Sequence, residues 1–222
     1  MSILRRQLLG LTTLWVVLAS ALPLGSNRPL SWLLLACVVF ALFAVQLAFD
    51  IFKGIDSPSR KTFIPFVIFV AVLGWAWTQS TLLVDSHLAH PVWSVLPLSA
   101  GSRISADPIE TQHHIVRLAT YAMVFWLALR ASRAGDFSDI SLRTTAIFIS
   151  LMSTYGILSV VYGSNPILGE FTSNSVSATF VNRNNFATFA VIGLLSNVTM
   201  YIRSSNISTH DPARRLSDFL EG

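Results

Sequence analysis

Long runs without a formal charge constrain this 222-residue chain more than any other feature. Runs of 19 to 26 uncharged residues lie at 7–27, 29–49, 62–84, 144–169 and 184–202. About 20 apolar residues in a helix cross the roughly 30 Å of a bilayer's hydrocarbon core. Only 12% of the residues are charged, roughly half the share in a soluble domain. The sequence therefore predicts an all-α integral membrane protein and excludes an ordinary soluble domain.

Residues 115–131 form a weaker sixth candidate, because Arg117 and Arg130 bracket only 12 uncharged residues. The distribution of basic residues tests this candidate. With six spans and a cytoplasmic amino terminus, eleven Lys and Arg residues lie inside and four outside; without this span the numbers are six and nine. The positive-inside rule therefore favours a polytopic protein of about six transmembrane helices with both termini cytoplasmic.

The expected organisation is a membrane domain over residues 1–203 and a polar cytoplasmic tail over 204–222. The expected helices lie near residues 8–24, 30–49, 62–79, 115–131, 144–163 and 184–202. Two arginines before the first apolar run also resemble a cleavable export signal. The five later spans make such a signal unnecessary, so we expect an uncleaved first helix.

The net charge of +4 raises the question of nucleic-acid binding. The basic residues lie between the apolar runs, and the sequence contains no glycine-rich phosphate loop, paired-cysteine zinc pattern or aromatic RNA-binding motif. Nucleic acid is therefore excluded as a partner, and the lipid bilayer is expected instead. Cys37 is the only cysteine, which excludes an internal disulfide and a cysteine-based metal cage.

A row of ionisable residues lies where the fourth helix is expected to begin. The order Asp-Pro-Ile-Glu over 107–110 is typical of a helix start. Glu110, His113, His114 and Arg117 follow at i, i+3, i+4 and i+7 and share one helical face. Such a face either meets an anionic head group or a proton-transfer partner, or it snorkels to the membrane surface. No further ligand completes a metal site here, so no metal is expected.

The outer loop before the last span ends in a second polar group. The loop is rich in Gly, Ser, Asn and Thr, which favours irregular structure. Asn182, Arg183, Asn184 and Asn185 then lead directly into the apolar run. Free backbone N–H groups at a helix start favour anions, and an arginine fork pairs with phosphate oxygens. An alternative interpretation accounts for the same residues without a specific site. In it, an asparagine caps the helix and Arg183 contacts ordinary lipid phosphates.

The octapeptide Phe-Val-Asn-Arg-Asn-Asn-Phe-Ala over residues 180–187 resembles the signature of the O-antigen ligase and polymerase family. Segments 90–93 and 104–108, followed by a helix with Arg117 and Tyr121, are similar to the outer loop and mid-chain helix of that family. The resemblance implies a bacterial inner-membrane glycosyltransferase of polysaccharide or lipopolysaccharide biosynthesis. Such enzymes transfer or polymerise glycan from an undecaprenyl pyrophosphate carrier on the periplasmic side, without a nucleotide sugar or an obligatory metal, so no cofactor is expected.

The resemblance also implies roles for individual residues. Arg183 is expected to neutralise charge on the leaving pyrophosphate. The expected substrate-binding residues are Arg183, Asn182, Asn184, Asn185 and Arg117. Family members are much longer, and their catalytic loop lies beyond the counterpart of residue 222, so we expect a second half that is either lost or encoded separately. The general base is therefore unassigned, with His113, His114 and Glu170 as weak candidates.

Two other functions are compatible with the sequence. One is a non-catalytic membrane remnant or scaffold that binds lipid-linked glycan. The other is a small-solute transporter, which is less well supported because the spans contain almost no midmembrane charges and no paired, interrupted helices.

The topology predicts that Ser173 lies on the outer side of the membrane. In a variant without Cys37, a cysteine at position 173 should therefore react with a membrane-impermeant thiol reagent added from the periplasmic side. Cysteine-accessibility labelling measures this directly. Labelling from the cytoplasmic side alone would contradict the six-span arrangement.

Overall fold

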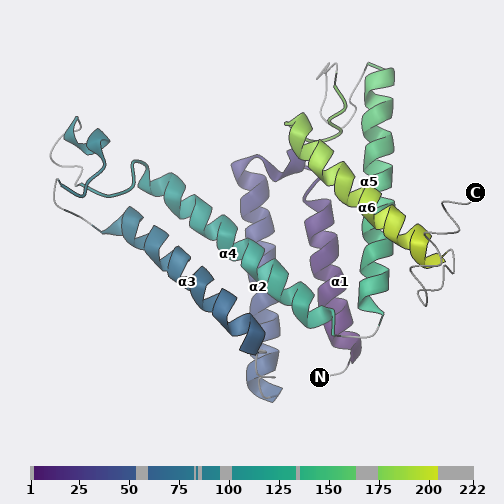
Figure 1. The fold of residues 1–222 in the computed structure, drawn as a ribbon, viewed down its shortest axis with the longest axis horizontal. Coiled ribbons are helices and arrows are strands. Elements are labelled where there is room, and N and C mark those ends of the chain that lie inside the picture. Colours follow the sequence, from purple (N-terminus) through teal and green to yellow (C-terminus); the bar gives the residue numbers. More distant parts are fainter. Residues whose placement is uncertain are drawn as a thin grey trace, which may run out of the picture. The chain divides into compact units, whose positions relative to one another are not determined.

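A computed structural model gives the fold, and it describes residues 3–53, 60–82, 84, 87–95, 102–133, 136–163 and 175–204. These residues form six α-helices and two short 3-10 helices and include no strand. The helices are α1 (Ile3–Ala19), η1 (Leu24–Ser26), α2 (Pro29–Lys53), α3 (Arg60–Thr81), η2 (Pro91–Ser94), α4 (Pro108–Ala131), α5 (Phe137–Val161) and α6 (Arg183–Ser204) (Figure 1). The expected all-α class is confirmed for this part of the chain.

Four helices are long and apolar enough to cross a membrane. Their qualifying segments are Pro29–Phe52, Ile64–Thr81, Phe137–Val161 and Arg183–Arg203, in α2, α3, α5 and α6. The apolar part of α1 is shorter, Gln7–Ala19, and α4 carries Glu110, Arg117 and Arg130 along its length. The four apolar helices indicate a membrane protein in a lipid bilayer, while the number of six spans, the membrane domain 1–203 and the orientation of the termini stay predictions. The expected tail 204–222 lies almost entirely outside the described residues.

The start of α4 follows from its sequence. The Asp107 carboxylate accepts a hydrogen bond from the backbone N–H of Glu110 at 3.0 Å, and Pro108 occupies the first helical position. Proline has no N–H, so it fits a first turn whose N–H groups have no partner within the helix. The capping prediction is therefore confirmed. The helix begins before the expected span at residue 115, because its first turns are polar and precede the apolar segment.

Contacts divide the chain into two compact units. Unit 1, Met1–Val17 and Arg28–Gly135, contains most of α1 together with α2, α3 and α4. Unit 2, Leu18–Asn27 and Asp136–Gly222, contains α5, α6 and the connection between α1 and α2. Within unit 1, α4 packs on both α2 and α3; within unit 2, α5 packs on α6 (Figure 1). The turn after α1 and the loop before α6 therefore belong to one unit.

The contact between α5 and α6 depends on a small residue. A methyl group placed on Gly193 of α6 would lie 2.3 Å from Cγ2 of Ile149 on α5. One turn further along α6, the Asn197 amide donates to the Ser150 hydroxyl at 3.0 Å and to the backbone carbonyl of Gly193 at 2.8 Å. Lipid tails are as apolar as the helix surface, so close backbone approach and interhelical hydrogen bonds drive association in a membrane. Gly193 therefore sets how closely the two helices pack.

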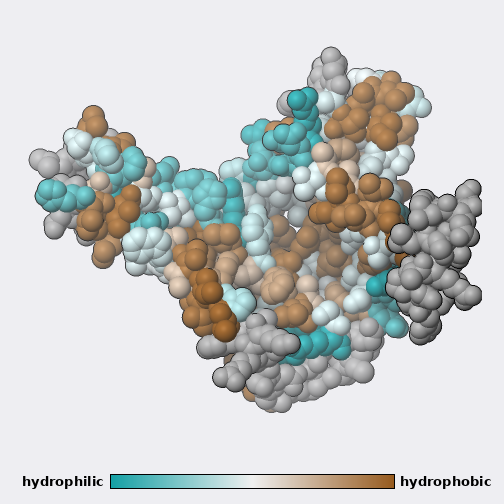
Figure 2. Space-filling view, in the orientation of Figure 1, coloured by the Kyte–Doolittle hydropathy of each residue, from teal (hydrophilic) through white to brown (hydrophobic). Residues whose placement is uncertain are grey.

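Large apolar side chains are exposed along α3 and α6. On α3, Ile64, Phe66, Ile68 and Trp75 are each at least 56% exposed. Figure 2 shows the hydrophobic colour along this helix. Contiguous apolar surface of this extent marks a protein or membrane contact rather than a water-exposed face. This surface agrees with the length and apolarity that make α3 and α6 candidate membrane spans.

Gly193→Ala should destabilise the folded protein by about 1 to 3 kcal/mol, because the added methyl group overlaps a β-branched side chain close to its own backbone. Unfolding of the purified protein in detergent measures the change. Gly74→Ala on α3 is the matched control, because a methyl group there meets nothing within 4 Å and alanine favours a helix by up to about 1 kcal/mol. Equal stability of the two variants would contradict the close contact.

Candidate functional site

Asn182 caps α6. Its side-chain oxygen accepts a hydrogen bond from the backbone N–H of Asn184 at 2.8 Å, and its backbone carbonyl accepts from the N–H of Phe186 at 3.2 Å. The first bond satisfies one of the donors that a helix start leaves without a partner. The capping role considered for the asparagines is therefore confirmed for Asn182.

Arg183 is the first residue of α6, and its side chain is exposed. Its guanidinium forms no ion pair or hydrogen bond with another residue in the described part of the chain. Asn184 and Asn185 are also exposed. We call residues Asn182–Asn185 the Arg183 surface. An exposed guanidinium beside helix-start N–H groups is suited to bind an anion, and phosphate matches the guanidinium fork best.

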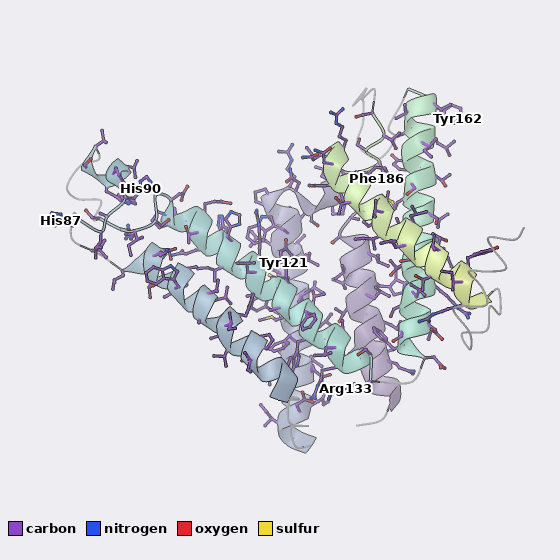
Figure 3. The ribbon with its side chains drawn as sticks, in the orientation of Figure 1. His87, His90, Tyr121, Arg133, Tyr162 and Phe186 are labelled. Carbon is purple, nitrogen blue, oxygen red and sulfur yellow. The ribbon has the colours of Figure 1, made fainter. Side chains whose placement is uncertain are left out.

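Phenylalanines lie on both sides of the Arg183 surface in the sequence, and both are packed. Phe186 is 6% exposed and belongs to a core cluster with Met152 and Ala178. Phe180 packs against this cluster, with its ring centroid 5.9 Å from that of Phe186 and 5.1 Å from that of Phe189. Figure 3 shows Phe186 on the first turns of α6. The octapeptide thus consists of packed aromatic residues around an exposed polar centre.

The residues before the Arg183 surface pack on the turn between α1 and α2. The Thr179 side chain is fully buried, and its hydroxyl donates to the backbone carbonyl of Ala21 at 2.7 Å. A methyl group placed on Gly25 would lie 2.6 Å from Cδ1 of Phe180. The hydrogen bond joins residues 158 positions apart, and no local sequence pattern could have indicated either contact.

In unit 1, the ionisable face of α4 packs on α2 through Trp32. The guanidinium carbon of Arg117 lies 4.5 Å from the Trp32 ring centroid, and the His113 ring meets the same ring edge-on at 5.5 Å. Trp32 is only 6% exposed. Its indole N–H has no hydrogen-bond partner among the described residues. The face therefore meets protein through Arg117 and His113. The sequence did not indicate that Trp32 is their partner.

Glu110 lies between the two histidines of this face. One carboxylate oxygen is 3.2 Å from Nδ1 of His113, and the other is 3.5 Å from Nε2 of His114. These side chains are 42% to 61% exposed, so solvent screens their interaction. The structure thus brings Glu110, His113 and His114 together, whereas Glu170, the third candidate base, lies outside the described residues. No group of three side chains suited to hold a metal ion occurs in the part of the chain that the structure describes.

A buried ion pair joins α2 and α4 at their other ends, and the sequence did not indicate it. Arg130 pairs with Asp50, whose carboxylate also accepts from the Gln46 amide at 2.9 Å. Arg130 and Asp50 are 5% and 9% exposed. The Trp126 ring centroid lies 5.9 Å from the guanidinium carbon of Arg130. The i, i+4 spacing of Gln46 and Asp50 is a local pattern that indicates their hydrogen bond. The pairing of Asp50 with Arg130 of α4 depends on the fold.

The loop between α3 and α4 holds the remaining histidines of the described residues. Figure 3 shows His87 and His90 beyond one end of α3 and α4, and Arg133 beyond the other end of α4. His90 Nδ1 accepts from the backbone N–H of Val92 at 3.2 Å, and the Trp93 indole donates to the backbone carbonyl of Ser105 at 2.9 Å. These bonds give His90 and Trp93 structural roles within the loop.

No family model, curated protein or solved structure matches the chain. The resemblance to the O-antigen ligase and polymerase family therefore rests on the octapeptide, the two outer segments and the following helix with Arg117 and Tyr121. The structure describes two polar groups that the sequence singled out. The Arg183 surface lies in unit 2, and the face of Glu110, His113, His114 and Arg117 lies in unit 1.

The contact between Arg117 and Trp32 should be measurable by a double-mutant cycle. We expect Arg117→Met and Trp32→Leu to show a coupling free energy of about 0.5 to 2 kcal/mol, the range of a cation–π contact that is partly shielded from water. The exposed Arg133 is the matched control, and Arg133→Met combined with Trp32→Leu should be additive. Unfolding in detergent gives the four free energies of each cycle. A coupling of zero in the first cycle would show that the two side chains do not interact.

Proposed function

We propose that this chain is a bacterial inner-membrane protein of cell-surface polysaccharide assembly, which binds an undecaprenyl pyrophosphate-linked glycan at the periplasmic surface for transfer or polymerisation. The exposed Arg183 at the start of α6 carries the proposal, because its fork and the neighbouring N–H groups suit a phosphate. The octapeptide that contains Arg183 supplies the family resemblance. A pyrophosphate on a lipid carrier reaches the membrane surface, where such a residue can bind it.

The proposal includes six spans, so that α1 and α4 cross the membrane together with the four more apolar helices. Ionisable side chains within a span are costly unless they are paired or reach water. The basic residues of α4 have such partners, since Arg117 covers Trp32 and Arg130 pairs with Asp50. These contacts support a transmembrane α4, and the eleven-to-four distribution of basic residues supports cytoplasmic termini.

In the proposed reaction, an acceptor hydroxyl attacks the anomeric carbon of the carrier-bound sugar. The bond between this carbon and the pyrophosphate oxygen breaks, and its electron pair leaves with the pyrophosphate. Arg183 stabilises the negative charge that develops there. The exposed Asn184 and Asn185 amides are suited to bind sugar hydroxyls. The proton of the acceptor passes to a general base, which is not assigned to a residue.

A second candidate is a non-catalytic protein that binds the lipid-linked glycan and presents it to another chain. This role needs only the exposed Arg183 surface and no general base. Binding without transfer would identify the scaffold. A small-solute transporter finds no comparable support.

The test of the site is binding of undecaprenyl pyrophosphate to the purified protein in nanodiscs. Arg183→Ala should weaken binding roughly ten- to a hundredfold, because losing a charge-assisted hydrogen-bonded pair costs about 1.5 to 3 kcal/mol. Arg183→Lys should have a smaller effect, since lysine keeps the charge but not the planar fork.

The control is Arg143→Ala, which removes an exposed arginine of α5 and should leave binding unchanged. Competition by phosphatidylglycerol distinguishes the carrier from ordinary lipid phosphates. Parent-like binding by Arg183→Ala would show that Arg183 is an ordinary interfacial arginine, and the proposed site would be wrong.

A further inference from the structure

The turn between α1 and α2 has an unusual backbone. Leu24, Gly25 and Ser26 follow one another with φ of 56°, 59° and 55°. This left-handed region suits glycine, but an ordinary side chain adopts it only at a cost. A strained backbone persists where surrounding contacts determine it, and such places are concentrated at functional sites. The contacts around this turn therefore indicate what it does.

The turn is held from two sides. From its own side, the Ser26 hydroxyl donates to the backbone carbonyl of Ser20 at 2.7 Å, and the N–H of Gly25 donates to the carbonyl of Ala21 at 3.1 Å. From the other side, the buried Thr179 hydroxyl donates to the same Ala21 carbonyl. A carbonyl oxygen has two lone pairs, so Ala21 can accept both bonds. The turn thus presents a carbonyl that is aimed at Thr179.

The segment that docks on the turn is strained as well. Ala178 is fully buried with φ of 47°, and the N–H of Phe180 donates to the carbonyl of Ser177 at 2.8 Å. Gly25 has no side chain, which leaves room for the Phe180 ring. Thr179 and Phe180 are therefore fixed, and only Val181 and Asn182 separate them from Arg183.

We propose that the Ala21–Asn27 turn positions Arg183, with Gly25 and Thr179 as positioning residues. The outer loop that leads to Arg183 is rich in residues that favour irregular structure. Fixing Thr179 and Phe180 reduces the freedom that Arg183 would lose when it binds an anion. The inference rests on the proposed function for the identity of that anion, while the effect of the turn on the loop is independent of any ligand.

The first experiment measures the position of the loop without a ligand. A nitroxide label is attached at Val181→Cys, an exposed site outside the Arg183 surface, in a protein whose Cys37 is replaced by alanine. Thr179→Val removes the hydroxyl with little change of shape and should increase label mobility in the electron paramagnetic resonance spectrum. Thr179→Ser, which keeps the hydroxyl, should restore the parent spectrum. The control is Thr199→Val, because the Thr199 hydroxyl bonds only within its own helix, to the carbonyl of Leu195.

The second experiment measures affinity for undecaprenyl pyrophosphate in nanodiscs with the unlabelled proteins. Thr179→Val should weaken binding about two- to tenfold, as expected for the loss of one hydrogen bond, while Thr179→Ser should bind like the parent. Gly25→Ala should act in the same direction and more strongly, because its methyl group meets Phe180 at a positive φ. If Gly25→Ala does not accumulate in the membrane, the Thr179 variants provide the test alone.

The outcomes separate this inference from the proposed function. An unchanged label spectrum in Thr179→Val would show that the turn does not hold the loop, and the inference would be overturned. Suppose that Arg183→Ala loses binding, while Thr179→Val gives a more mobile label but binds like the parent. This result would overturn the positioning role and leave the ligand site at Arg183 unaffected. If Arg183→Ala itself binds like the parent, the proposed function fails, and the label spectrum still decides whether the turn holds the loop.

Discussion

The structure depends first on the need of every peptide group for a hydrogen-bond partner. In hydrocarbon an unbonded N–H or C=O costs several kcal/mol, so a chain with long uncharged runs satisfies its backbone within helices. Four of the six helices meet the length and apolarity of a membrane span. Since lipid covers an apolar surface as well as protein does, the contacts between helices come from small residues, aromatic rings and paired charges.

The two units use these contacts in different ways. In unit 1, α2 and α4 are joined by Trp32 beneath Arg117 and by the buried pair of Asp50 and Arg130. In unit 2, α5 and α6 approach closely at Gly193, and the aromatic cluster around Phe186 packs the loop before α6. Removing one partner of a buried ion pair leaves an uncompensated charge, so Asp50 and Arg130 favour one pairing of α2 with α4 over others.

The octapeptide shows how a short motif can serve packing and chemistry together. Its phenylalanines pack in the core of unit 2, while Asn182 caps a helix and Arg183 is exposed at the helix start. Substitution of a phenylalanine and substitution of the arginine are therefore different experiments. The first disturbs the loop, and only the second removes a group that can meet a phosphate. Substitution of Gly25 in the strained turn is comparable to substitution of a phenylalanine, because the turn acts on Arg183 through the backbone.

The sequence by itself determined the all-α class and the cap at Asp107, because run length and capping depend on neighbouring residues. It also singled out the face of Glu110, His113 and Arg117, since helical periodicity places such residues together. Only the tertiary structure decided that Trp32 meets this face, that Arg130 is buried against Asp50, and that Thr179 bonds to the turn after α1. These partners lie far apart in the chain. Many helix faces are equally apolar, so close steric fit and pairs of polar groups determine which faces pack together. Neither of these leaves a local pattern in the sequence.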